Sequence, residues 1–119
     1  MSLKTKSILK TIRIAVGLNE DTTDFDTDLL IHINGAIGKL NQNGVNSIIY
    51  VNDETTTWSE LDDPINVEGN KISQMFPIYV TLSTKMLFDP PPPSTIEYYA
   101  RNIDEILWRI KIAYETTEI

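Results

Sequence analysis

The chain has 119 residues, a formal net charge of −7 and no cysteine. This length suits one domain around one core, so we expect a single domain over residues 1–119. Without cysteine, disulfides, iron–sulfur clusters and thiolate zinc sites are excluded. The apolar runs are far shorter than the roughly 20 residues that cross a bilayer, and the charged N-terminal segment differs from a signal peptide, so no membrane partner is expected.

Basic and acidic residues are segregated along the chain. The first 14 residues hold four basic residues and no acid, whereas two acidic belts follow at 20–28 and 53–68. A protein that grips nucleic acid needs a basic face of some extent, which only this N-terminal segment could supply. We therefore expect the acidic belts to be mainly solvated loops. As an alternative function we keep a small helical nucleic-acid-associated or regulatory protein that uses the basic N-terminal segment. The basic residues are Lys4, Lys6, Lys10 and Arg13.

Two helices are expected in the first third of the chain. Apolar residues between Leu3 and Val16 fall loosely on one helical face, and Gly17 is a natural C-cap. Asp24 and Asp26 both qualify as the N-cap of a second helix, which Asn43-Gly44 would close. Its apolar positions follow the helical period at Leu29, Ile33, Ala36, Ile37 and Leu40.

Gly35 and Gly38 lie inside this second helix. Each glycine lowers helix stability by about 1 kcal/mol relative to alanine in a helix interior, so we expect it to have a compensating role. Glycines at this spacing often let another backbone come close, and the sequence therefore predicts a packing role for them.

The middle of the chain, between Val45 and Asn70, has a different character. Residues 48–51 form a short β-favouring run, and Thr57 with Glu60 has the spacing of a capping box for a single helical turn through Leu61. We expect an extended loop or short hairpin that projects from a helical body.

Two further helices are expected in the last third. Residues 71–88 have a helical period with Pro77 inside it, which favours a long helix bent at that proline over one that begins there. Pro90 to Pro93 form a stiff spacer, and Ser94 to Glu97 have capping-box spacing for the final helix. The core side of that helix is predicted at Ile96, Ala100, Ile103, Leu107, Ile110 and Tyr114. Together the elements predict an all-α fold, a small bundle of about four helices with an extended loop or short hairpin in the middle.

No pattern of residues indicates catalysis. The single histidine, His32, has no cysteine to pair with, and the serines lack a nucleophile motif. The acidic run 24–28 lacks the glycine and glutamate that a calcium loop of the EF-hand type requires. We therefore expect no enzyme activity, no metal and no cofactor.

Five residues of the final helix form a second face with the composition of a protein–protein interface. Aromatic, aliphatic and arginine side chains are enriched in such interfaces. At this point two interpretations are equally open: an oligomer interface, or burial under another part of the same chain. The five residues are Tyr98, Arg101, Glu105, Trp108 and Ile112.

Several segments resemble the small head–tail connector (adaptor) proteins of long-tailed bacteriophages and prophages. Residues 24–34 resemble the start of their second helix, and residues 53–61 resemble their middle segment. Residues 87–91, 103–110 and 113–115 resemble their C-terminal helical hairpin. The match covers the chain from about residue 8 to 115 in the same order. The four prolines exceed what the family usually shows, so the angle between the last two helices is expected to differ.

The resemblance implies a structural virion protein at the head–tail junction, made in the bacterial host cytoplasm. It implies a homo-oligomer, a dodecameric ring beneath the portal protein, that extends the channel for DNA packaging and docks the next connector or tail protein. DNA would pass through without sequence-specific binding, along acidic walls. Neither catalysis nor a cofactor is implied.

Overall fold

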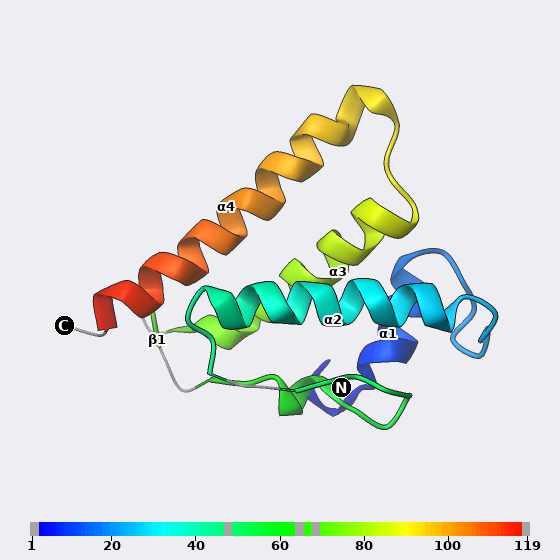
Figure 1. The fold of residues 1–119 in the computed structure, drawn as a ribbon, viewed down its shortest axis with the longest axis horizontal. Coiled ribbons are helices and arrows are strands. Elements are labelled where there is room, and N and C mark those ends of the chain that lie inside the picture. Colours follow the sequence, from blue (N-terminus) through cyan, green and yellow to red (C-terminus); the bar gives the residue numbers. More distant parts are fainter. Residues whose placement is uncertain (1–2, 47–48, 64–65, 68–69, 118–119) are drawn as a thin grey trace.

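The computed structural model describes residues 3–46, 49–63, 66–67 and 70–117. Four α-helices dominate it, so the predicted all-α bundle is confirmed (Figure 1). A two-residue antiparallel ladder joins Asn66 to Lys71 and Val67 to Asn70. In chain order the elements are a 3₁₀ turn at Leu3–Thr5, α1 (Ile8–Ala15), α2 (Asp26–Gln42), a 3₁₀ turn at Trp58–Glu60, β1 (Asn66–Val67), β2 (Asn70–Lys71), a 3₁₀ turn at Ile72–Met75, α3 (Phe76–Phe88) and α4 (Pro93–Thr117).

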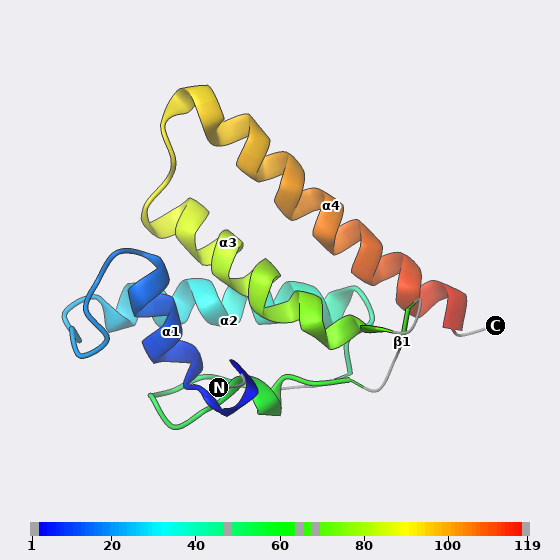
Figure 2. The same ribbon diagram turned by 180° about the vertical axis from the view of Figure 1, so that it is seen from behind.

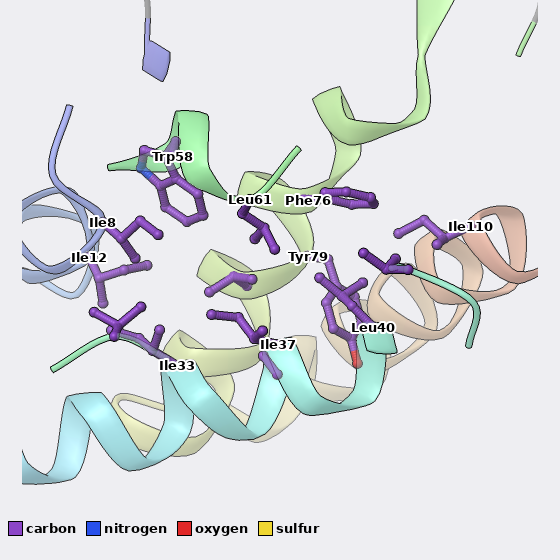
Figure 3. Close-up of a cluster of buried hydrophobic side chains, with 14 of the residues drawn as sticks. Ile8, Ile12, Ile33, Ile37, Leu40, Trp58, Leu61, Phe76, Tyr79 and Ile110 are labelled. Carbon is purple, nitrogen blue, oxygen red and sulfur yellow. The ribbon is translucent and has the colours of Figure 1, made fainter. Parts of the chain in front are cut away.

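Helix α2 lies at the centre of the bundle and all of its predicted apolar positions are buried. Helix α3 crosses it and α1 packs at one end of it, whereas α4 packs against α3 and the 3₁₀ turn that precedes α3 (Figures 1 and 2). Figure 3 shows the resulting core, in which side chains from all four helices and from the middle segment meet. The buried residues outside α2 include Ile8, Ile12, Val51, Trp58, Leu61, Phe76, Tyr79 and Ile110.

Helix α1 is shorter than the predicted span from Leu3 to Val16. It begins at Ile8, after Ser7, whose side chain accepts a hydrogen bond from the Lys10 N–H at 3.2 Å. The backbone before it is held by the middle segment, because the Trp58 N–H donates to the Lys6 carbonyl and the Ile8 N–H donates to the Thr56 carbonyl. These tertiary hydrogen bonds replace helical ones. The predicted stop is confirmed, since Gly17 adopts φ +90°.

The predicted N-caps of α2 are wrong. Phe25 occupies the N-cap position without a side-chain capping bond, and Asp26 is already the first helical residue. The Asp26 carboxylate binds Arg13 instead of the helix's own N–H groups. At the other end Gly44 has φ +116°, as the Asn43-Gly44 pattern predicts. A Cβ at Gly44 would lie 2.6 Å from Cβ of Tyr114, so glycine is required there by packing as well.

The packing role predicted for Gly35 and Gly38 is also wrong within this chain. A Cβ added at either position would meet no atom within 4 Å. Both glycines therefore face open space on α2.

The middle segment does not project from the bundle as predicted. Val51, Trp58 and Leu61 are buried in the core, and the Thr57–Glu60 capping box forms, with the Thr57 N–H donating to Glu60 at 2.8 Å. Residues 49–51 of the β-favouring run form no strand, and Ser47 and Ile48 lie outside the described residues. The Asn34 side chain takes the place of a strand partner: its amide donates to the Val51 carbonyl and its oxygen accepts from the Val51 N–H.

The favoured prediction of a long helix bent at Pro77 is wrong, and the alternative start near this proline is right. Helix α3 begins at Phe76, with Pro77 in its first turn, and a 3₁₀ turn precedes it. A proline in the first turn sacrifices no helical hydrogen bond, because the first N–H groups of a helix have no partner there.

Helix α4 begins at Pro93, one residue before the expected N-cap, Ser94. The Thr95 and Ile96 N–H groups donate to the Pro92 carbonyl, so the last proline of the run is the first helical residue. The predicted core side is only partly correct. Ile110 and Tyr114 are buried, but Ile96 remains 37% exposed because the N-terminal half of α4 extends away from the bundle.

Candidate oligomer interface on α4

The five interface candidates form one continuous stripe along α4. Their spacing of three, four, three and four residues keeps them on one helical face, and the stripe is roughly 21 Å long at 1.5 Å per residue. At 100° per residue it lies opposite the buried positions Ile110 and Tyr114. We call Tyr98, Arg101, Glu105, Trp108 and Ile112 the outer stripe.

The two aromatic residues of the outer stripe are exposed. Tyr98 is 67% exposed and Trp108 is 61% exposed, while Ile112 is half-buried. Tyr98 also packs edge-on against Tyr99, with ring centroids 6.5 Å apart. A helix that keeps Trp and Tyr on the face turned away from its own core offers apolar area to a partner.

Charged groups flank these aromatic side chains. The Arg109 guanidinium donates to Glu105 at 2.7 Å, and both side chains are more than half exposed. An exposed ion pair of this kind contributes little to stability, at most about 1 kcal/mol. Its charges therefore remain available to a partner surface.

A cleft lies on the opposite side of α4, between its N-terminal half and helices α2 and α3. Its volume is about 420 Å³. Ile31 of α2 and Leu87 of α3 line it and are 62% and 64% exposed, and Ala100 and Ile103 line it from α4. His32, Lys39 and Asp104 add polar groups to this mostly apolar lining. The sequence patterns did not predict this cleft. Two large apolar residues were the available signal: Ile31 lies outside the predicted apolar stripe of its helix, and Leu87 lies at the end of its own.

A buried ion-pair cluster centred on Arg13 was likewise not predicted from the sequence. Its guanidinium donates to Asp26 at 3.0 and 2.6 Å, to the Glu20 carbonyl at 2.6 Å, and to Glu54. Hydrogen bonds that the guanidinium donates to the Asp26 carboxylate raise the pKa of Arg13, so the charge is permanent. The available signal was the place of Arg13 four residues after Leu9, on the apolar face of α1. Arg13 is thus removed from the basic N-terminal surface.

The remaining chemistry-bearing residues are scattered. His32 is half-buried in the wall of the cleft. Within the described ranges no three His, Asp or Glu side chains are grouped so that they could hold a metal ion. In the same residues no helix is long and apolar enough to cross a membrane.

Comparison with known proteins identifies the family. A family model described as phage connector protein matches residues 8–117, which is nearly the whole chain. No curated protein and no solved structure matches this chain. Taken with the all-α fold and the matching order of segments, this places the chain in the phage connector protein family.

Proposed function

We propose that the chain is a structural virion protein that forms a ring, commonly twelve-fold in this family, between the portal and the tail. In this role it extends the DNA channel and docks the next connector or tail component at the head–tail junction. It acts as one helical domain without catalysis or cofactor, and it is made in the host cytoplasm before assembly. Family membership supports this role in general terms.

The observation that carries the ring is the outer stripe of α4. Trp108 and Tyr98 expose large apolar surfaces on a helix face that no other part of the described chain covers. Exposed aromatic groups beside arginine have the composition of interface hot spots. Contacts between two different faces of identical subunits close into rings when the rotation per subunit permits.

The acidic balance supports passage of DNA. With a net charge of −7, a ring of many copies would present a strongly negative surface. Negative channel walls repel phosphates, so DNA would slide without sequence-specific binding.

The structure offers no specific support for a nucleic-acid-associated function as an alternative. Arg13, one of the four basic residues near the N-terminus, is committed to Asp26 and Glu54. Salt-sensitive DNA binding in a shift assay, with a slope that corresponds to several phosphate contacts, would favour that alternative over the ring.

The test of the ring is Trp108→Ala, examined by electron microscopy of the protein at high concentration and mixed with its portal. We expect rings for the wild type and their loss in the variant, because truncation removes a central exposed anchor. Circular dichroism should show unchanged helical content, since Trp108 makes little contribution to the core.

Tyr50→Ala is the matched control, because Tyr50 is an equally exposed aromatic residue outside α4. It should assemble like the wild type. Normal rings from Trp108→Ala would remove the outer stripe from the interface, and equal loss in both variants would mean that exposed aromatic groups act non-specifically.

A further inference from the structure

The cleft between α2, α3 and α4 exists because α4 buries only its C-terminal half. Ile110, Ala113 and Tyr114 are buried, whereas Ile96, about three turns before Leu107 on the same predicted core side, remains exposed. Figure 2 shows α3 and α4 joined by a loop at the end where α4 begins, with the two helices held apart. The predicted core side of α4 is therefore open to solvent in the N-terminal half of the helix.

The loop between the two helices keeps the cleft open. It contains Pro90, Pro91 and Pro92, and α4 itself begins with Pro93. Each proline has a fixed φ, so a run of them forms a stiff connection whose length and direction change little. The cleft is thus maintained by the stiff connection between α3 and α4, and another segment can bind in it.

The chemistry of the cleft specifies that occupant as an amphipathic helix. Helices dock in apolar grooves through anchors at i, i+3 or i+4, and i+7. The outer stripe of α4 has this pattern, with aromatic anchors at Tyr98 and Trp108. Since the outer stripe and the cleft lining are opposite faces of one helix, one copy can offer its stripe to the next while receiving another in its own cleft.

The charges on the two surfaces also match. The cleft carries a cation on its α2 wall, Lys39, and an anion on its α4 wall, Asp104. The outer stripe carries Arg101 and Glu105 about one helical turn apart, between its aromatic anchors. A stripe seated in the cleft can therefore place Glu105 toward Lys39 and Arg101 toward Asp104, which favours one orientation.

We propose that the occupant of the cleft is the outer stripe of a second copy of this chain. This inference rests on the proposed ring and names its contact: the outer stripe of each subunit docks between α2, α3 and α4 of its neighbour. The contact is heterologous, as ring closure requires, because the two faces differ.

Gly35 and Gly38 provide a matched pair of variants to test the proposal. Both lie within α2 and both have open space around an added Cβ, but only Gly35 lines the cleft. Leucine has a higher helix propensity than glycine at either position, so both variants should fold with unchanged circular dichroism and a Tm no lower than that of the wild type. Gly35→Leu fills the cleft, whereas Gly38→Leu does not.

Electron microscopy of both variants and the wild type, with and without the portal, then shows which proteins form rings. We expect wild-type rings from Gly38→Leu and loss of rings from Gly35→Leu. Normal rings from Gly35→Leu would overturn the proposed contact, whereas the proposed ring itself would stand. The same conclusion would follow if those rings formed normally but no longer bound another connector component. Absence of rings from the wild type would overturn the ring and this contact together.

Because the chain has no cysteine, a crosslinking experiment can identify the two faces directly. A variant carrying both Gly35→Cys and Glu105→Cys, treated with a short bismaleimide, should give a ladder of linked subunits up to the closed ring. Either substitution alone should give no linked dimer, because the contact joins different faces. A dimer from Glu105→Cys alone would show stripe-to-stripe pairing and overturn the proposal.

Discussion

Arg13 shows how one residue can join segments that are far apart in the sequence. It lies on α1, and its guanidinium binds Asp26 at the start of α2 and Glu54 in the middle segment. Its side chain is only 1% exposed, so its charge depends on these partners. The same interaction explains why Asp26 does not cap α2. The local sequence pattern predicts Asp26 as a cap, but its carboxylate forms a tertiary ion pair with Arg13 instead.

Arg13→Met should lower the free energy of unfolding by about 1.5–3 kcal/mol, because two partly exposed carboxylates lose the cation that they face. Urea denaturation followed by circular dichroism measures this change. Arg109→Met is the control: its exposed pair with Glu105 should contribute at most about 1 kcal/mol. Equal losses in the two variants would contradict a structural role for the Arg13 cluster.

Within the helices, two threonine hydroxyls have opposite environments. Thr11 of α1 accepts a hydrogen bond from the Trp58 indole at 2.8 Å and donates to the carbonyls of Ser7 and Ile8 in the first turn. Thr84 of α3 is fully buried, and its hydroxyl has no hydrogen-bond partner within the part of the chain that the structure describes. A satisfied buried hydroxyl stabilises the fold, whereas an unsatisfied one destabilises it.

The same substitution should therefore have opposite effects in the two helices. Thr84→Val should leave the free energy of unfolding unchanged or raise it by about 1–3 kcal/mol, because a methyl group replaces an unpaired hydroxyl. Thr11→Val should lower it by about 1–3 kcal/mol, because the Trp58 indole N–H loses its acceptor. Thermal and urea unfolding of both variants measure the signs, and destabilisation by Thr84→Val would show that its hydroxyl is hydrogen-bonded.

At the scale of the whole molecule, the C-terminal end of α4 is attached to both the middle segment and the turn that follows α2. Tyr114 is buried against Gly44, and its phenol lies near the Asp63 carboxylate. The N-terminal half of α4 has no comparable attachment and forms one wall of the cleft. The subunit thus combines a fixed anchor at one end of α4 with an exposed surface along the rest, which is the arrangement that the proposed ring requires.

The anchor predicts how stability depends on pH. Burial and the nearby Asp63 carboxylate raise the pKa of Tyr114 above its ordinary value of 10.0. The folded state therefore favours the protonated phenol, so this contribution is complete below about pH 10 and is lost as the pH rises further. We expect the free energy of unfolding of the wild type to fall more between about pH 8 and about pH 11 than that of Tyr114→Phe.

Urea denaturation of both proteins at the two pH values measures the difference. Tyr79, whose pKa burial also raises, is present in both proteins and cancels in the comparison. Equal losses of stability in the two proteins would contradict the proposed contribution of the buried Tyr114 phenol.

Local patterns in the sequence determined the helices and their stops. The period of Leu29, Ile33 and Leu40 predicted the buried face of α2, and Gly17 and Gly44 predicted helix ends, because helical hydrogen bonds and left-handed caps involve neighbours a few residues apart. The order of family-like segments likewise predicted the phage connector family.

Only the tertiary structure decided which local signals were used. Trp58 and Val51 are buried by helices distant in the chain, and Arg13 binds residues 13 and 41 positions away. The open half of α4 follows from the angle that the prolines impose, which no helical period encodes. Burial and ion pairing depend on which segments meet in space, and that meeting is decided by the packing of the whole chain.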